Sequence, residues 1–421
     1  MSGRPFQHEP RVRFAAAALA AAFACAPARA DGDGIHGRLE LQNTDAFARG
    51  DSIDASFGAK NRDDVLVNLR LTWEPTWDRW SFSFHYLLAT QYGDSVPLAR
   101  DETGLLAMPP STWFSLTDTF ADRGRLTALH TIDRLTVGYT TPTFVIRVGR
   151  QALTWGSGLV FRPMDLFDPF SPTAIDTEYK PGTDMVYVQF LFEDGSDLQV
   201  IAVPRPEHAG AMPSSDASSF ALHYHSTVFG HQTTAFLARD HGDWVAGLGV
   251  NGALGGATWN IELVPTFVNH GASRLSGIAN ISDAVTLFDR NATVFAEYFH
   301  NGFGAGNSAF ALTALPPDLL DRLGRGQVFN TRRDYLAAGV TLEVTPLLNV
   351  SSTVMAGLDD ASAYATLAGT YSLSDNLTLV AGAQAPIGSA NTEFGGMPVT
   401  VGNHTVLAPP SQLYLQIRQY F

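Results

Sequence analysis

The sequence predicts an all-β fold, a transmembrane antiparallel β-barrel of about 18 strands, with about 16 strands as the alternative. Three observations lead to this fold class. The chain begins with an export signal, long segments alternate apolar and polar residues, and short turns alternate with longer loops up to an aromatic C-terminus. We expect residues 1–30 to be a cleaved signal peptide and residues 31–421 to form a single barrel with an inward-folded loop.

The first thirty residues have the pattern of a secretory signal. Residues 4–13 carry three arginines, residues 14–26 are apolar and rich in alanine, and residues 28–30 (Ala-Arg-Ala) form a small-x-small cleavage site. The apolar stretch is shorter than the ~20 residues that a spanning helix needs. No later apolar run in the sequence approaches that length.

Cleavage after Ala30 removes Cys25, the single cysteine of the chain. The alternative, a lipoprotein signal around Cys25, lacks the usual leucine three residues earlier. A mature chain without cysteine has no disulfide, zinc–thiolate site or cysteine nucleophile. Cleavage also takes four Arg and one Glu from 27 basic and 41 acidic residues, so the formal charge moves from −14 to −17. Such an acidic chain argues against a nucleic-acid partner, because phosphate neutralisation needs Lys and Arg.

Period-two alternation identifies the strands. In 65–73 (VLVNLRLTW) the odd positions are apolar, and in 80–88 (WSFSFHYLL) the even positions are apolar. This period gives a strand one apolar and one polar face. A soluble β-sandwich shows the same period, but segments of roughly 9–12 residues match a tilted membrane crossing.

The complete set of predicted strands is even in number, as single-chain bacterial barrels require. They lie at 35–45, 64–74, 79–91, 131–139, 142–153, 184–193, 196–204, 218–228, 231–239, 242–252, 256–267, 271–281, 291–302, 334–344, 347–357, 360–371, 375–386 and 411–421. Short turns are expected on one side, with a longer turn at 282–290. Long connections are expected on the other side at 46–63, 92–130, 154–183, 205–217, 303–333 and 387–410.

The chain ends on Tyr420-Phe421 after an alternating segment, which is similar to the assembly signal of outer-membrane barrels; Gln419 stands where an apolar residue is often found. We therefore expect an integral outer-membrane location, contacts with lipid and lipopolysaccharide, and recognition of Phe421 by the barrel-assembly machinery. Both termini fall on the side of the short turns, which we expect to be periplasmic.

Charged residues on the inward faces are the candidate pore lining, because barrels of 16–18 strands leave an aqueous channel. The predicted basic groups come from strands that share one wall: Arg70, His85, Arg134, Arg147 and Arg418. The predicted carboxylates come from later strands: Glu262, Glu297 and Glu343. Two interpretations remain open: a transverse field that selects polar solutes, or local pairing that satisfies a polar interior.

The connection 154–183 is the most distinctive segment. It carries Trp155, Phe161, Leu166, Phe167 and Phe170, which favour an inward fold because a compact loop buries its own apolar side chains. The polar and aromatic residues that we assign to this constriction are Arg150, Gln151, Trp155, Arg162, Asp165, Asp168 and Lys180. Another connection, 315–324, has two prolines at its start and a glycine at its end, the pattern of a short helix.

The segment Gly149-Arg150-Gln151 followed by Trp155-Gly156 resembles uncharacterised proteobacterial outer-membrane porin-like proteins, and more weakly the alginate-export type of barrel. The likeness covers roughly residues 130–190, and the rest of the chain only by barrel patterning. It implies a solute channel with a charged constriction. Uronic-acid export would imply a strongly cationic lumen.

Enzymatic motifs are weak in this chain. Residues 247–252 (GLGVNG) match the dinucleotide-binding spelling G-x-G-x-x-G but lie inside an alternating segment without the following helix that the motif requires. His223 and His225 share a strand face, whereas Ser226 lies on the other, and no G-x-S-x-G elbow occurs. His130, His208 and His231 show no metal-ligand spacing. We expect no catalysis, metal or cofactor.

These observations predict passive diffusion of small polar solutes through a lumen narrowed by residues 154–183. The alternatives are a non-conducting barrel that sheathes a partner protein or exports a polymer, and a barrel hydrolase acting on lipid or peptide. The identity of the solute and the oligomeric state stay open.

Overall fold

The computed structural model describes residues 34–101, 111–306, 310–402 and 404–421, so the predicted signal peptide lies outside the described residues. The chain forms a closed antiparallel barrel of 18 strands. Its wall consists of β1 (Ile35–Phe47), β2 (Asn61–Trp73), β4 (Trp80–Gly93), β6 (Leu126–Thr140), β7 (Phe144–Gln151), β8 (Thr183–Leu191), β9 (Asp197–Val203), β10 (Ser219–Val228), β11 (His231–Asp240), β12 (Asp243–Leu254), β13 (Ala257–Phe267), β14 (Arg274–Leu287), β15 (Arg290–His300), β16 (Asp334–Thr345), β17 (Leu348–Gly357), β18 (Ser362–Ser374), β19 (Leu377–Ile387) and β22 (Ser411–Tyr420).

Each wall strand pairs with the next wall strand along the chain, and β1 closes the ring against β22. At this seam the backbone N–H of Gly37 donates to Phe421 over 2.8 Å, and the N–H of Phe421 donates back to Gly37 over 3.0 Å. A side chain at Gly37 would collide with the Phe421 ring. The C-terminal aromatic residue therefore belongs to the closure of the barrel.

The predicted strands all correspond to wall strands, and two connections differ from expectation. The longer turn predicted at 282–290 is wrong: β14 continues to Leu287 and a two-residue turn follows. Phe288 and Asp289 have φ of 54° and 57°, the left-handed conformation that tight hairpin turns favour. In the connection 92–130, β5 (Thr117–Arg123) pairs with the first half of β6, where β7 does not reach.

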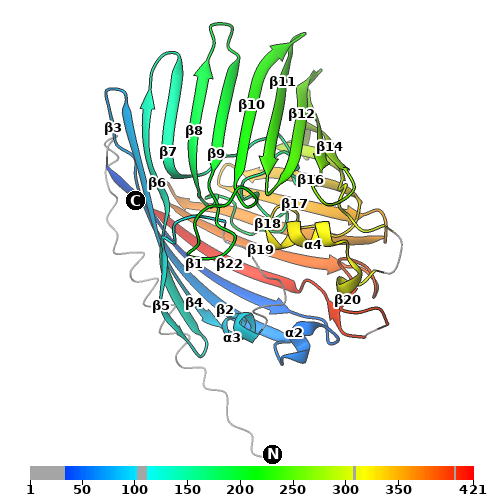
Figure 1. Cartoon of the computed structure of the whole chain (residues 1–421). Helices are drawn as coiled ribbons and strands as arrows, with labels where there is room; N and C mark the ends of the chain where they lie inside the picture. Colours follow the sequence, from blue (N-terminus) through cyan, green and yellow to red (C-terminus); the bar gives the residue numbers. More distant parts are fainter. Residues whose placement is uncertain (1–33, 102–110, 307–309, 403) are drawn as a thin grey trace, which may run out of the picture.

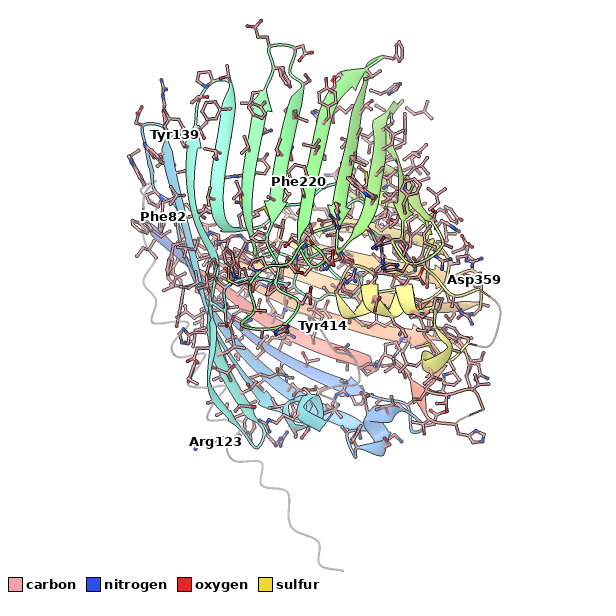
Figure 2. All side chains as sticks on the ribbon, in the orientation of Figure 1. Phe82, Arg123, Tyr139, Phe220, Asp359 and Tyr414 are labelled. Atoms are coloured by element: carbon pink, nitrogen blue, oxygen red, sulfur yellow. The ribbon has the colours of Figure 1, made fainter. Side chains whose placement is uncertain are left out.

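The alternation of the sequence becomes an outer apolar face and an inner mixed face. Large apolar side chains are exposed on the outside of the wall, among them Leu135, Val148, Val186, Phe220, Leu237, Trp244, Ile261, Leu263, Leu336, Leu367 and Leu413. Figure 2 shows Phe220 on this outer wall. A soluble protein rarely exposes so extensive an apolar surface.

The two ends of the barrel differ. Tight turns and the beginning of β1 occupy one end, the turn side; β3 (Thr76–Trp77) lies in one of these turns. The long connections occupy the loop side and hold α2 (Ile53–Ser56), α3 (Ser95–Asp101), η1 (Leu312–Ala314), α4 (Pro317–Gly324), β20 (Met397–Pro398) and β21 (Val406–Leu407). The expected helix at 315–324 is thus confirmed as α4. No helix in the described ranges is both long and apolar enough to cross a membrane.

The long β5–β6 part of the wall can be followed in Figure 2, where Tyr139 lies at the upper end of β6 and Arg123 lies at the lower tip of the β5–β6 hairpin. The connection from β7 to β8, residues 152–182, does not extend from the loop side but runs among the strands inside the ring (Figure 1). Its apolar residues pack with wall residues in two buried clusters. We call residues 152–182 the inward loop.

Candidate functional site

The inward loop leaves β7 at a backbone irregularity. Gly149 has φ +124°, and a Cβ there would lie 2.0 Å from the carbonyl oxygen of Leu135 on β6. The next residue, Arg150, is buried and donates from Nε to Asp184 at the start of β8 over 2.8 Å. The two ends of the loop are therefore joined by a buried ion pair at the rim of the wall. Gln151 beside it is buried, and its Nε2 lies 3.5 Å from the Arg147 carbonyl oxygen.

The first turn of the loop is held by aromatic stacking. The Trp155 ring stacks on His223 of β10 at a centroid distance of 4.7 Å and on Phe236 of β11 at 5.4 Å. Its indole N–H donates to Gln199 of β9 over 3.1 Å. A buried indole needs such a polar partner. The stretch that resembles porin-like proteins is thus the one that enters the lumen.

Two inward carboxylates of the wall bind the loop backbone. Glu297 of β15 is 0% exposed and accepts the N–H groups of Leu159, Val160 and Phe161 over 2.7 to 2.9 Å. Glu262 of β13 is 1% exposed and accepts the N–H of Ser157. Successive backbone N–H groups form a concave site for an anion, and here a wall carboxylate occupies it. Both glutamates therefore anchor the loop.

The far end of the loop reaches the barrel seam. Arg38 of β1 donates to Asp176 and to Glu178 over 2.7 Å each, and Tyr420 of β22 donates to Glu178 over 2.9 Å. The Gln384 amide of β19 donates to the carbonyl oxygen of Thr173 over 3.1 Å. The loop is thus fixed to the wall on opposite sides of the lumen.

The base of the loop contains a buried ion pair. Lys180 Nζ lies 2.6 and 2.7 Å from the two carboxylate oxygens of Asp165. Burial raises the pKa of Asp165 to about 6, against the opposing effect of Lys180, and burial lowers the pKa of Lys180. Asp168 has φ 51° and accepts a hydrogen bond from the Thr183 hydroxyl. These contacts fold the loop back on itself before it meets β8.

The predicted basic residues lie on the inner face, and three of them have acidic partners. Arg70 pairs with Asp133 at 2.6 Å and lies 4.2 Å over the Tyr179 ring. His85 contacts Glu74 at 2.9 Å, and Arg418 contacts Glu40 at 3.0 Å. These contacts correspond to local pairing, the second interpretation of the charged lining.

The other predicted lining residues have weaker attachments. Arg134 donates to the carbonyl oxygens of Asp133, over 2.7 Å, and of Lys180. Arg147 lies 4.4 Å over the Tyr187 ring. Glu343 accepts from Asn291 over 3.0 Å near the turn side.

The inward loop separates two pockets that share part of their lining. The outer pocket, about 760 Å³ including space open to solvent, lies between the loop, the wall from β11 to β15 and residues 327–330 of an outer connection. The inner pocket lies between the loop and side chains of β15, β17 and β18. Both pockets are lined by Val160, Arg162, Phe170 and Pro172. Arg162 lies 5.6 Å over the Phe170 ring and makes no ion pair with any residue that the structure describes.

Sequence reasoning missed the residues that hold the far end of the loop: Arg38, Glu40, Asp176, Glu178 and Tyr179. The alternation of 35–45, in which Arg38 and Glu40 share the polar face with His36 and Gln42, is a signal that could have identified the two strand residues. The loop partners carry no comparable periodic signal.

The histidines have structural surroundings. His223 stacks on Trp155, and His225 Nδ1 lies 3.4 Å from Asp197. Within the described ranges, no group of three or more His, Asp or Glu side chains is placed to hold a metal ion.

No protein-family model matches the chain, and a search of curated proteins finds no relative. Solved structures do match. OccAB2 of Acinetobacter baumannii aligns with a TM-score of 0.53 at 12% identity, over 92% of this chain and 98% of that one. OccK2 (OpdF) of Pseudomonas aeruginosa, solved in complex with glucuronate, aligns with a TM-score of 0.52 at 9% identity, over 92% and 97%. Both are Occ/Opd outer-membrane porins. At these identities the likeness shows that this chain shares their barrel fold.

Proposed function

We propose that this chain is an outer-membrane channel through which small polar solutes diffuse, with the inward loop as its constriction. The apolar outer face of the wall supports a place in a lipid bilayer, where a closed barrel satisfies all backbone hydrogen bonds. In the orientation usual for such barrels the turn side and both termini face the periplasm and the loop side faces outward.

The observation that carries this proposal is the pair of pockets on either side of the inward loop. They share Arg162 and Phe170, so a solute that passes from one to the other meets the guanidinium and the ring together. The loop is tied to the wall at both ends of its path across the lumen, by Trp155 and Glu297 near its start and by Arg38 at the seam. A constriction fixed in this way favours size and charge selection over free flow.

Planar-bilayer recording of the purified, refolded chain tests the proposal. Wild type is expected to show resolvable open-channel steps, and deletion of residues 156–180 should enlarge them because the constriction is removed. Because the deletion removes many wall contacts, Arg162→Trp serves as a milder second variant that should reduce the step size. A barrel that inserts but never conducts, even after the deletion, would contradict the channel proposal and would favour a barrel that sheathes a partner.

Polymer export has less support. The weak likeness to alginate-export barrels would require a strongly cationic passage, whereas the two pockets share one cation, Arg162. We infer no hydrolase function either: by strand alternation Ser226 belongs to the face opposite His223 and His225, so a nucleophile and its base would not meet.

A further inference from the structure

Apolar side chains form much of the lining of the outer pocket. The three buried apolar clusters found among the described residues all contribute to its lining: Val245 and Val264 from the first, Phe161 and Phe299 from the second, and Phe303 from the third. The Phe161 ring stacks on Phe299 with a centroid distance of 4.6 Å and an interplanar angle of 18°. A strongly polar solute gains nothing from such a surface, because apolar walls cannot replace its hydration.

The charged groups of this pocket are largely engaged by the protein. Asp165 is held by Lys180, and Asp240 accepts from Ser219 and from Gln327, the latter over 2.7 Å. The second lining arginine, Arg322, donates to Asp243 over 2.8 Å and lies 4.0 Å over the Phe303 ring.

Arg162 differs from these groups, since it lines the pocket without an ion pair among the described residues. Ligand sites commonly combine apolar walls with a few placed polar groups. Here aliphatic and aromatic side chains line the pocket beside neutral polar ones such as Thr266 and Asn301, and the charged group without an ion pair is a donor.

We propose that the outer pocket binds a small molecule that carries a flat apolar ring and a hydrogen-bond-accepting group. The ring would lie against Phe161, Phe299 and Val264, and the acceptor would face Arg162. This inference rests on the proposed channel function and narrows its solute class, from small polar solutes in general to amphipathic ring compounds.

Two matched pairs of probes test the ring requirement: benzamide against acetamide, and benzoate against acetate. Binding to the refolded full chain is measured by titration calorimetry. Each ring compound is expected to bind at least about tenfold more tightly than its acetyl partner, in the neutral pair and in the anionic pair alike. If the acetyl partners bind as well as the ring compounds, or the ring matters only in the anionic pair, the proposal is overturned. Calorimetry does not require conduction, so failure of the channel proposal would be seen separately in the bilayer.

Two phenylalanine variants on neighbouring positions of β13 locate the site. Val264 is 4% exposed and lines the pocket, so Val264→Phe should fill it and lower the affinity for benzamide at least about tenfold. Leu263 is 47% exposed on the outer face, so Leu263→Phe should leave the affinity for benzamide unchanged. This variant serves as the control for benzamide that partitions into the detergent around the barrel. Equal affinities in the two folded variants would overturn the assignment. If Val264→Phe does not fold, the wild-type probe pairs still decide the proposal.

Discussion

Arg38 on the first strand of the barrel donates to Asp176 near the far end of the inward loop over 2.7 Å, across 138 residues of sequence. Arg38 is 3% exposed, and the Asp176 side chain is 25% exposed. Burial acts to raise the pKa of Asp176, but hydrogen bonding and charge from Arg38 outweigh it and lower that pKa. Because β1 closes the barrel against β22, this contact fixes the constriction to the seam.

Replacing Arg38 with methionine should release the far end of the inward loop. The change leaves Arg418, which lies 3.0 to 3.8 Å from Glu40, Asp176 and Glu178, as their remaining cation. Loss of one partner from a buried pair costs up to about 3–5 kcal/mol. Since two of these carboxylates are partly exposed, we expect about 2 kcal/mol and a larger, noisier single-channel conductance. Arg49→Met is the matched control, because Arg49 pairs with Asp51 where both side chains are about 40% exposed. Equal conductances in the two variants would contradict this role of Arg38.

Glu297→Gln should loosen the near end of the loop. A glutamine offers one acceptor oxygen to the three backbone N–H groups of residues 159–161. Its amide NH2 group is a donor, so it cannot accept a hydrogen bond from the N–H groups that the second carboxylate oxygen bound. Hydrogen bonds to a charged acceptor contribute about 1.5–3 kcal/mol each, so we expect a loss on the order of 3 kcal/mol in loop anchoring and increased conductance. Glu343→Gln is the control, since Glu343 contacts an asparagine of the neighbouring strand and not the loop. An unchanged conductance in Glu297→Gln would remove Glu297 as an anchor.

The strands could be predicted from the sequence because a barrel wall imposes one physical rule on every strand. Each crossing must present apolar residues to lipid and can present polar ones to the lumen. The alternation of apolar and polar residues in 65–73 and 80–88 therefore identifies both segments as strands. The same rule failed at 282–290, where Asp283 interrupts the apolar face although the backbone ladder continues to Leu287. Pairing with β15 there outweighs the weak side-chain pattern.

The site was harder to predict, because its contacts join residues distant in sequence. Alternation placed Glu262 and Glu297 on the inner face, but nothing in the sequence says that backbone N–H groups from 157–161 will meet them. Likewise the aromatic content of the connection favoured an inward fold, whereas its attachment to Arg38 depends on the path of the loop across the lumen. Facing a lumen and being free to bind a solute are therefore separate properties.

Arg162→Gln should change ion selectivity. The guanidinium lines both pockets and has no ion pair among the described residues, so its charge acts on permeating ions. We expect the ratio of chloride to potassium permeability, obtained from the reversal potential in a KCl gradient, to fall about two- to fivefold, for a change in local interaction of about 0.5–1 kcal/mol. Arg239→Gln is a control near the loop-side rim, where Arg239 and Asp216 form an exposed pair. A reversal potential that is unchanged in Arg162→Gln would place the passage elsewhere.

Glu393 links two outer connections and should make their contact depend on pH. Its carboxylate accepts the backbone N–H of Thr331 over 2.8 Å and the hydroxyl hydrogen of Tyr335, and its own N–H donates to Asp360. Burial raises the pKa of Glu393 from 4.5 to about 7, and the nearby Asp360 carboxylate acts in the same direction. A raised pKa in the folded state means that the stabilising contribution is complete below pH 4.5 and is lost as the pH rises through 7.

Limited proteolysis of the refolded barrel measures this dependence through cleavage in residues 310–333 and 388–402. The rate of cleavage should rise between pH 6 and pH 8 in wild type, because ionised Glu393 is buried against its neighbours. Glu393→Gln stays neutral and keeps an acceptor for the Thr331 N–H, so its rate should follow only the pH dependence of the protease. Dividing the wild-type rate by the variant rate at each pH removes that dependence. A ratio that stays constant from pH 6 to pH 8 would show that Glu393 does not titrate in this range, since a carboxyl group with a pKa near 7 changes from mostly neutral to mostly ionised across these two units.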